Sequence, residues 1–168
     1  MQTALTHVLD ELERERAALL ATIAGLDDAA LDRKGIIGAW SIKNCLAHLA
    51  GWESWVLGSL PTRLATGAVP EPLRSATVDE DAWNAEQVAR REELSPTAQI
   101  EALARTRAKL VAYLRQLGPA ALVRRRPWPS WEDSLGDYIL AAIRDHDREH
   151  LPDLRAARAL VTAEVDMI

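Results

Sequence analysis

The part of the sequence that most clearly indicates the fold is residues 41–60, which run Ser41-Ile42-Lys43-Asn44-Cys45-Leu46-Ala47-His48-Leu49-Ala50-Gly51-Trp52-Glu53-Ser54-Trp55-Val56-Leu57-Gly58-Ser59-Leu60. Serine is a favoured residue at the cap position before the first turn of a helix. After Ser41, apolar residues recur at the three- or four-residue spacing that places them on one helical face: Ile42, Leu46, Leu49, Val56 and Leu60. The pattern predicts a helix from Ser41 to about Leu60.

The same spacing extends through most of the chain and predicts three more long helices, over about residues 3–24, 95–117 and 134–161. No segment alternates as a strand does, and no internal repeat is present. Helices of about 20 residues are roughly 30 Å long and pack by default as a bundle. We therefore predict an all-α fold, with residues 1–168 forming a single four-helix-bundle domain.

A long connection joins the second and third predicted helices. Pro61 and Gly67 mark its first part, and Thr77-Val78-Asp79-Glu80 has the form of a capping box that opens a short polar helix to about Leu94. The bundle is thus expected to contain a long crossover connection that carries a short extra helix.

Composition and charge exclude several classes of protein. No run approaches the ~20 apolar residues of a membrane helix, and the charged segment 10–16 is wrong for a signal peptide. The single cysteine, Cys45, forms no intramolecular disulfide, which is compatible with a cytoplasmic location. A net charge of −5 argues against a dedicated nucleic-acid-binding protein.

Three histidines form the main candidate site. His146 and His150 are four residues apart, so both project from one face of the last helix. On their own they can bind a metal or be surface residues that pair with Asp147 or Glu149. His48 lies on another inward-facing helical stripe, and three buried imidazoles without partners would be costly. A divalent ion would satisfy them, and three ligands with an open position are typical of a catalytic site. Imidazole ligation suits zinc, nickel and iron alike.

Other side chains near His48 have two interpretations each. Trp52 and Trp55 lie on the same side as His48, either as core packing or as the walls of a substrate pocket. Glu53 interrupts an apolar stripe and is either a partner for a ligand imidazole or, as we favour, half of an ion pair with an arginine. Gly51 leaves room for a helix or a ligand.

A basic stretch, Arg124–Arg126, precedes the last helix together with Trp128 and Trp131. It superficially has the form of a nucleic-acid patch, but three arginines in an acidic protein are thin support. We expect an exposed loop, with binding of an anionic substrate or a thiol cofactor as the second interpretation. A DNA-associated stress protein is the least favoured function.

Two segments resemble the DinB-like superfamily of bacterial four-helix bundles: Gly38-Ala39-Trp40-Ser41-Ile42-Lys43-Asn44-Cys45-Leu46-Ala47-His48-Leu49-Ala50-Gly51-Trp52-Glu53 and Asp145-His146-Asp147-Arg148-Glu149-His150-Leu151-Pro152-Asp153-Leu154. The resemblance implies one divalent metal held by three histidines, here His48, His146 and His150. It also implies relatives such as thiol-dependent transferases and isomerases, including the N-terminal domain of mycothiol-dependent maleylpyruvate isomerase. A further branch, of the DfsB and colibactin self-resistance type, includes a hydrolase that need not use the metal.

These observations lead to two functional hypotheses. The first is a metal-dependent hydrolase, or a transferase or isomerase that uses a low-molecular-weight thiol, acting on a small electrophilic molecule. The alternative is a non-catalytic or metal-free bundle that binds a small molecule, with a self-resistance or stress-related role. Whether the protein is an enzyme therefore stays open at this stage. A homodimer is an expectation that rests on the resemblance alone.

Overall fold

The computed structural model describes residues 3–128 and 133–165, and in these ranges the chain is helical with no β-strand. The long helices are α1 (Ala4–Ile23), α3 (Ile42–Thr66), α5 (Pro96–Leu117), and a composite last helix made of α7 (Leu135–Ile139), a π-helical segment (Leu140–Asp145), α8 (His146–Glu149) and α9 (Leu151–Val165). Shorter elements are α2 (Asp28–Asp32), a 3₁₀ turn (Glu71–Thr77), α4 (Glu80–Ala89) and α6 (Pro119–Leu122).

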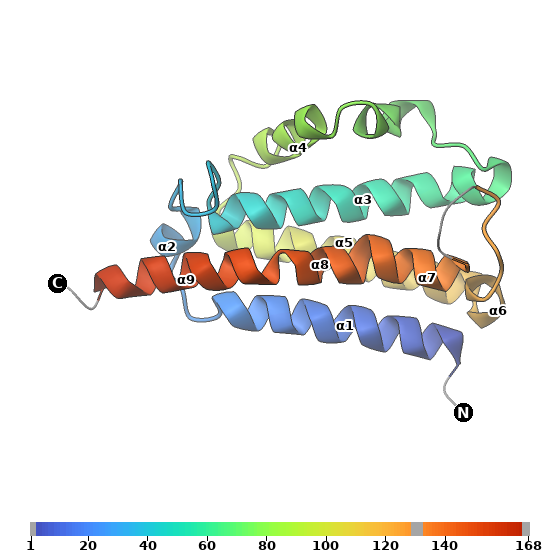
Figure 1. Ribbon diagram of the computed structural model, residues 1–168, viewed down its shortest axis with the longest axis horizontal. Coiled ribbons are helices and arrows are strands. Elements are labelled where there is room, and N and C mark those ends of the chain that lie inside the picture. Colours follow the sequence, from blue (N-terminus) through green and yellow to red (C-terminus); the bar gives the residue numbers. More distant parts are fainter. Residues whose placement is uncertain (1–2, 129–132, 166–168) are drawn as a thin grey trace.

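The long helices run side by side as the predicted bundle, and α4 lies along the outer side of α3 (Figure 1). Leucines from all of them fill the interior, and the side chains of Leu12, Leu46, Leu110 and Leu154 are fully buried. Burying each such side chain contributes about 1.5–3 kcal/mol. None of the described helices combines the length and the apolar character needed to cross a membrane.

The long helices begin close to the predicted residues, because a capping side chain fixes each start locally. Thr3, Ser41, Ser95 and Ser134 each precede a helix and accept a hydrogen bond from a backbone N–H in its first turn. Such caps satisfy donors that have no partner inside the helix. Gly118 ends α5, as expected.

The crossover connection differs from the prediction at both ends. Pro61 lies inside α3, which continues to Thr66. A proline inside a helix loses a hydrogen bond and crowds the preceding turn, and the packing of Leu64 against the core offsets this cost. The next helix, α4, is capped by Asp79 rather than Thr77 and ends at Ala89 rather than Leu94. The Thr77 hydroxyl is engaged elsewhere, since it donates to the Arg74 carbonyl within the 3₁₀ turn.

The last helix is less regular than its apolar spacing predicted. A π-helical segment, Leu140–Asp145, lies directly before α8, and the α-helical pattern is interrupted at His150. Pro152 occupies the second position of α9, where a missing N–H costs little. The segment that carries two of the histidines is therefore bounded by irregular turns on both sides.

Candidate metal centre

Three imidazoles from three places in the chain meet inside the bundle. His48 comes from α3, His146 begins α8, and His150 lies between α8 and α9. The Nε2 atom of His146 is 2.9 Å from that of His48 and 3.2 Å from that of His150. One ligand atom from each ring lies within 4.8 Å of the others, so the cluster can hold a metal ion.

The surroundings of the cluster keep its rings uncharged. Burial, reinforced by the other two imidazoles, lowers the pKa of His48 to about 3. Burial and His150 lower the pKa of His146 to about 4, and burial also lowers the pKa of His150. All three rings are therefore neutral at pH 7, which is the protonation state that binds metal. The donor set and its charge fit a single divalent ion of the imidazole-binding class.

Local features of the two helices explain how the rings meet. A π-helical turn widens the hydrogen-bonding step from four residues to five, and such turns are frequent at functional sites. Here it directly precedes His146 and changes the direction in which the following side chains point. On α3, a Cβ atom on Gly51 would lie 2.6 Å from the Gln87 side chain, so the missing side chain lets α4 pack closely beside the cluster.

A cavity of about 290 Å³ opens beside His146. Its walls come from α3, α4 and the last helix, and its lining residues are Trp52, Trp55, Val56, Glu80, Tyr138, Ala141, Ala142, His146 and Glu149. The Trp52 indole N–H donates to Asn84 on α4 at 2.8 Å, and the Trp55 indole N–H donates to the Leu73 carbonyl at 2.8 Å. The structure thus brings both tryptophans into one cavity with a member of the histidine cluster.

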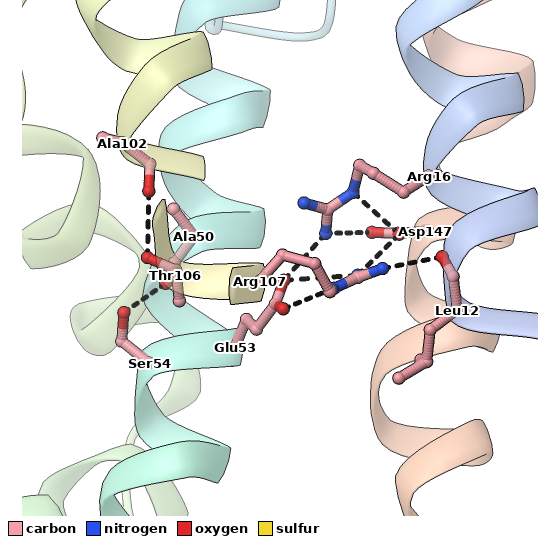
Figure 2. Close-up of polar contacts among 9 residues, drawn as sticks. All are labelled: Leu12, Arg16, Ala50, Glu53, Ser54, Ala102, Thr106, Arg107 and Asp147. Atoms are coloured by element: carbon pink, nitrogen blue, oxygen red, sulfur yellow. Dashed lines mark hydrogen bonds and ion pairs between the residues drawn. The ribbon is translucent and has the colours of Figure 1, made fainter. Parts of the chain in front are cut away.

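Glu53 lies in a separate, deeper polar cluster, drawn in Figure 2. It is 1% exposed and forms ion pairs with Arg16 of α1 and Arg107 of α5. Both arginines also pair with Asp147 of α8, and Arg107 donates to the Leu12 carbonyl. We call Arg16, Glu53, Arg107 and Asp147 the ionic network. Burial alone would lower the pKa of Arg16, but Asp147 and Glu53 outweigh it and raise that pKa.

Sequence reasoning missed three members of the ionic network: Arg16, Arg107 and Asp147. A signal for the arginines was present. Arg16 stands between Leu12 and Leu19 at helical spacing, and Arg107 stands between Leu103 and Leu110 in the same way. A charged residue on an apolar helical face must find a buried partner. Two such arginines, together with Glu53, therefore pointed to an interhelical ion-pair cluster.

One further aromatic residue and the single cysteine of the quoted segments lie around the two clusters or away from them. The Trp40 ring is 5.2 Å from the His48 ring. The Cys45 thiol is fully buried, which raises its pKa to about 12, and it is not part of the metal-binding group. Trp131 lies outside the described residues.

The expectation of an exposed loop at Arg124–Arg126 is correct only in part. Arg124 and Arg125 are exposed, but Arg126 is buried. The Arg126 guanidinium stacks 5.4 Å from the centre of the Trp128 ring. Cation–π stacking of this kind offsets part of the cost of burying the charge.

Comparisons with known proteins show the family of the chain and support its fold. The model of the family described as the DinB superfamily matches residues 11–154. Among solved structures, an uncharacterised protein from Escherichia coli UTI89 is similar, with a TM-score of 0.72, 15% identity and 96% of each chain covered. The colibactin self-resistance protein ClbS, in complex with a dsDNA, has a TM-score of 0.75, 13% identity, and coverage of 94% of this chain and 96% of that one. No curated protein matches significantly in sequence.

Proposed function

The chain belongs to the DinB superfamily, and from this premise we propose that it binds one divalent metal ion through His48, His146 and His150 and uses it on a small molecule. The observation that carries the proposal is the convergence of three neutral imidazoles within 4.8 Å of one another. We further propose that residues 1–168 act as one domain. Zinc, nickel and iron all suit the donor set.

The chemistry we propose is hydrolysis, or transfer or isomerisation with a low-molecular-weight thiol, of a small electrophile. A bound ion would supply a Lewis acid that lowers the pKa of a coordinated water or thiol. His48, His146 and His150 would hold the ion and leave a coordination position open. Trp52 and Trp55 would bind the apolar body of the substrate and keep bulk water away, because both line the cavity that contains His146.

A metal-free binding protein is the second candidate, and the tryptophan-lined cavity favours it. Apolar walls of this kind bind small molecules without help from a metal. By contrast, the DNA complex is a finding about ClbS. The net charge of −5 argues against proposing DNA binding for this chain.

Metal analysis of protein purified without a histidine tag tests the proposal. We expect close to one equivalent of zinc, nickel or iron in the wild type after equilibrium dialysis, and a loss of most of it in His146→Ala. His7→Ala is the matched control, because His7 is an exposed histidine outside the cluster. The same low metal content in the wild type and His146→Ala would sink the proposal. Tryptophan fluorescence that responds to small ligands but not to chelators would then favour the metal-free candidate.

A further inference from the structure

The ionic network lies on the same two helices that supply the histidines. Asp147 follows His146 directly in the chain, and Glu53 lies five residues after His48 on α3. Five helical residues advance about 7.5 Å along the axis. Each carboxylate of the network is therefore fixed, through a short piece of backbone, to a helix that carries a member of the histidine cluster.

Both arginines bridge both carboxylates. Arg16 Nη2 is 2.8 Å from Glu53 Oε2, and its Nε and Nη2 atoms are each 2.9 Å from an oxygen of Asp147. Arg107 Nη2 is 3.0 Å from Asp147 Oδ2, while its Nε donates to Glu53 Oε1 at 2.5 Å. Because of these bridges, α3 and α8 cannot slide or separate without breaking hydrogen bonds on both guanidinium groups (Figure 2).

The ionic network fixes the relative register of the helices more narrowly than apolar packing does. Leucine and valine surfaces pack well in several registers, whereas planar guanidinium groups donate to carboxylates only in a narrow range of directions. Buried ionic groups add little net stability compared with apolar residues of similar volume, and their best-attested use is to fix register. All four members here are at most 6% exposed, so each depends mainly on the other members for its hydrogen bonds.

We infer that Arg16 and Arg107 are positioning residues for the three-histidine site, which hold α3 and α8 at the spacing and register that bring His48 and His146 together. The two arginines do not line the cavity beside His146, and their hydrogen bonds go to Glu53 and Asp147 rather than to the imidazoles. They therefore act on the site through these two carboxylates. The part of this inference that concerns metal binding rests on the proposed function. The 2.9 Å approach of the His48 and His146 Nε2 atoms depends on the network even without a metal.

The test replaces the whole network by apolar residues of similar total volume, in a combined Arg16→Met, Glu53→Leu, Arg107→Met and Asp147→Val variant. Because no lone charge stays buried, this variant should fold. We expect its affinity for Co²⁺ to fall about 10- to 100-fold, the range usual for groups that orient metal ligands. We also expect an altered Co²⁺ visible absorption spectrum, which a purely structural role would not change. In a crystal structure of the metal-free variant, the two Nε2 atoms should lie clearly farther apart.

Arg158→Met is the matched control. Arg158 also ties two helices together, since it donates to the Thr22 and Ala24 carbonyls, but it contacts neither carboxylate of the network. The control should keep the wild-type Co²⁺ affinity and spectrum. If the combined variant does not fold, Arg107→Lys takes its place, because lysine keeps the charge but cannot reproduce the guanidinium fork.

Each outcome decides the inference separately from the proposed function. Wild-type Co²⁺ affinity and spectrum in a folded variant without the network would overturn the inference. If the wild type takes up no Co²⁺, the proposed function fails, and the distance between the His48 and His146 Nε2 atoms in the metal-free variant still decides this inference. An unchanged distance there would also overturn it.

Discussion

The histidine cluster and the ionic network lie in the same bundle and share α3 and α8, but only the ionic network is electrically complete. Its two arginines and two carboxylates balance one another, and their ion pairs link four helices. The histidine cluster contains three neutral rings, with the Nε2 atom of His146 close to those of His48 and His150, and His146 borders an open cavity. In the first cluster the charges are paired within the protein, whereas the second presents uncharged nitrogens beside a cavity.

The comparison shows two different uses of buried polar side chains, one structural and one suited to binding. A complete network fixes geometry, but the removal of one member leaves a charge without a partner in a medium of low dielectric constant. A cluster of uncharged imidazoles should lose less stability when one ring is removed, and an added ion should stabilise it. Four perturbations test this comparison, taken here from the largest expected effect to the smallest.

Arg107→Ala should cause the largest loss of stability. It leaves Glu53 and Asp147 buried with one cation between them, and the free energy of unfolding should fall by about 3–5 kcal/mol. Urea denaturation followed by circular dichroism measures this. The control is Arg105→Ala, which removes only an exposed pair with Glu101, so the change should be a few tenths of a kcal/mol. Equal effects for the two variants would contradict the view that Glu53 and Asp147 depend on Arg107 as a buried partner.

Acidification should destabilise the metal-free protein through the histidine cluster. The pKa values of His48 and His146 in the folded state, about 3 and about 4, lie below the value near 6.5 expected after unfolding. The contribution of these two rings to the free energy of unfolding is therefore fully present above about pH 6.5. It is lost as the pH falls through the folded-state values, by an amount on the order of 3 kcal/mol between pH 7 and pH 5. Urea midpoints between pH 4 and 7 measure it. A His48→Asn variant should weaken this dependence without removing it, because burial and His150 still lower the pKa of His146, whereas His7→Asn should leave it unchanged.

A divalent ion should stabilise the histidine cluster and leave the ionic network unaffected. At a free metal concentration 100 times its Kd, binding contributes about 2.7 kcal/mol. For a chain of this size that corresponds to a rise in Tm of roughly 5–10 °C. Scanning calorimetry with zinc or nickel measures the shift. His150→Ala should abolish it, and a rise of the same size in that variant would show that the ion binds elsewhere.

Asn84→Ala should have the smallest effect. It removes the acceptor for the Trp52 indole N–H and with it one tie between α4 and the wall of the cavity. The expected cost is about 1 kcal/mol. A chelator should also extract metal faster from this variant, because α4 is held less firmly beside the cluster. Glu86→Ala, on the exposed side of α4, serves as the control and should not change the extraction rate.

The sequence predicted the fold well where signals are local. Caps and apolar spacing gave the starts of the long helices, because a side chain that satisfies a backbone donor three residues away does not depend on the rest of the molecule. The predictions failed at Pro61 and Thr77. At those positions tertiary packing and a competing hydrogen bond decided the outcome. The π-helical segment before His146 left no mark in the apolar spacing.

The site was predictable only as a set of residue types. A pair of histidines at helical spacing and a third on another inward face indicated that a cluster was plausible, and the structure brings the three together. Of Glu53, the sequence favoured an arginine partner without identifying it. The partners are Arg16 and Arg107, which lie 37 and 54 residues away in the chain. Separations of that length carry no periodic signal.

By itself, the sequence determined that this chain forms a helical bundle, where its long helices begin, and which side chains are of the types that could ligate a metal. These properties depend on neighbours within one or two turns, whose spacing is fixed by the geometry of the helix. The tertiary structure alone decided which helices lie adjacent and in what register. It therefore separated two polar clusters that share the same helices: one in which charges cancel, and one in which three uncharged nitrogens converge. That separation arises from contacts across the bundle, which only the folded chain makes.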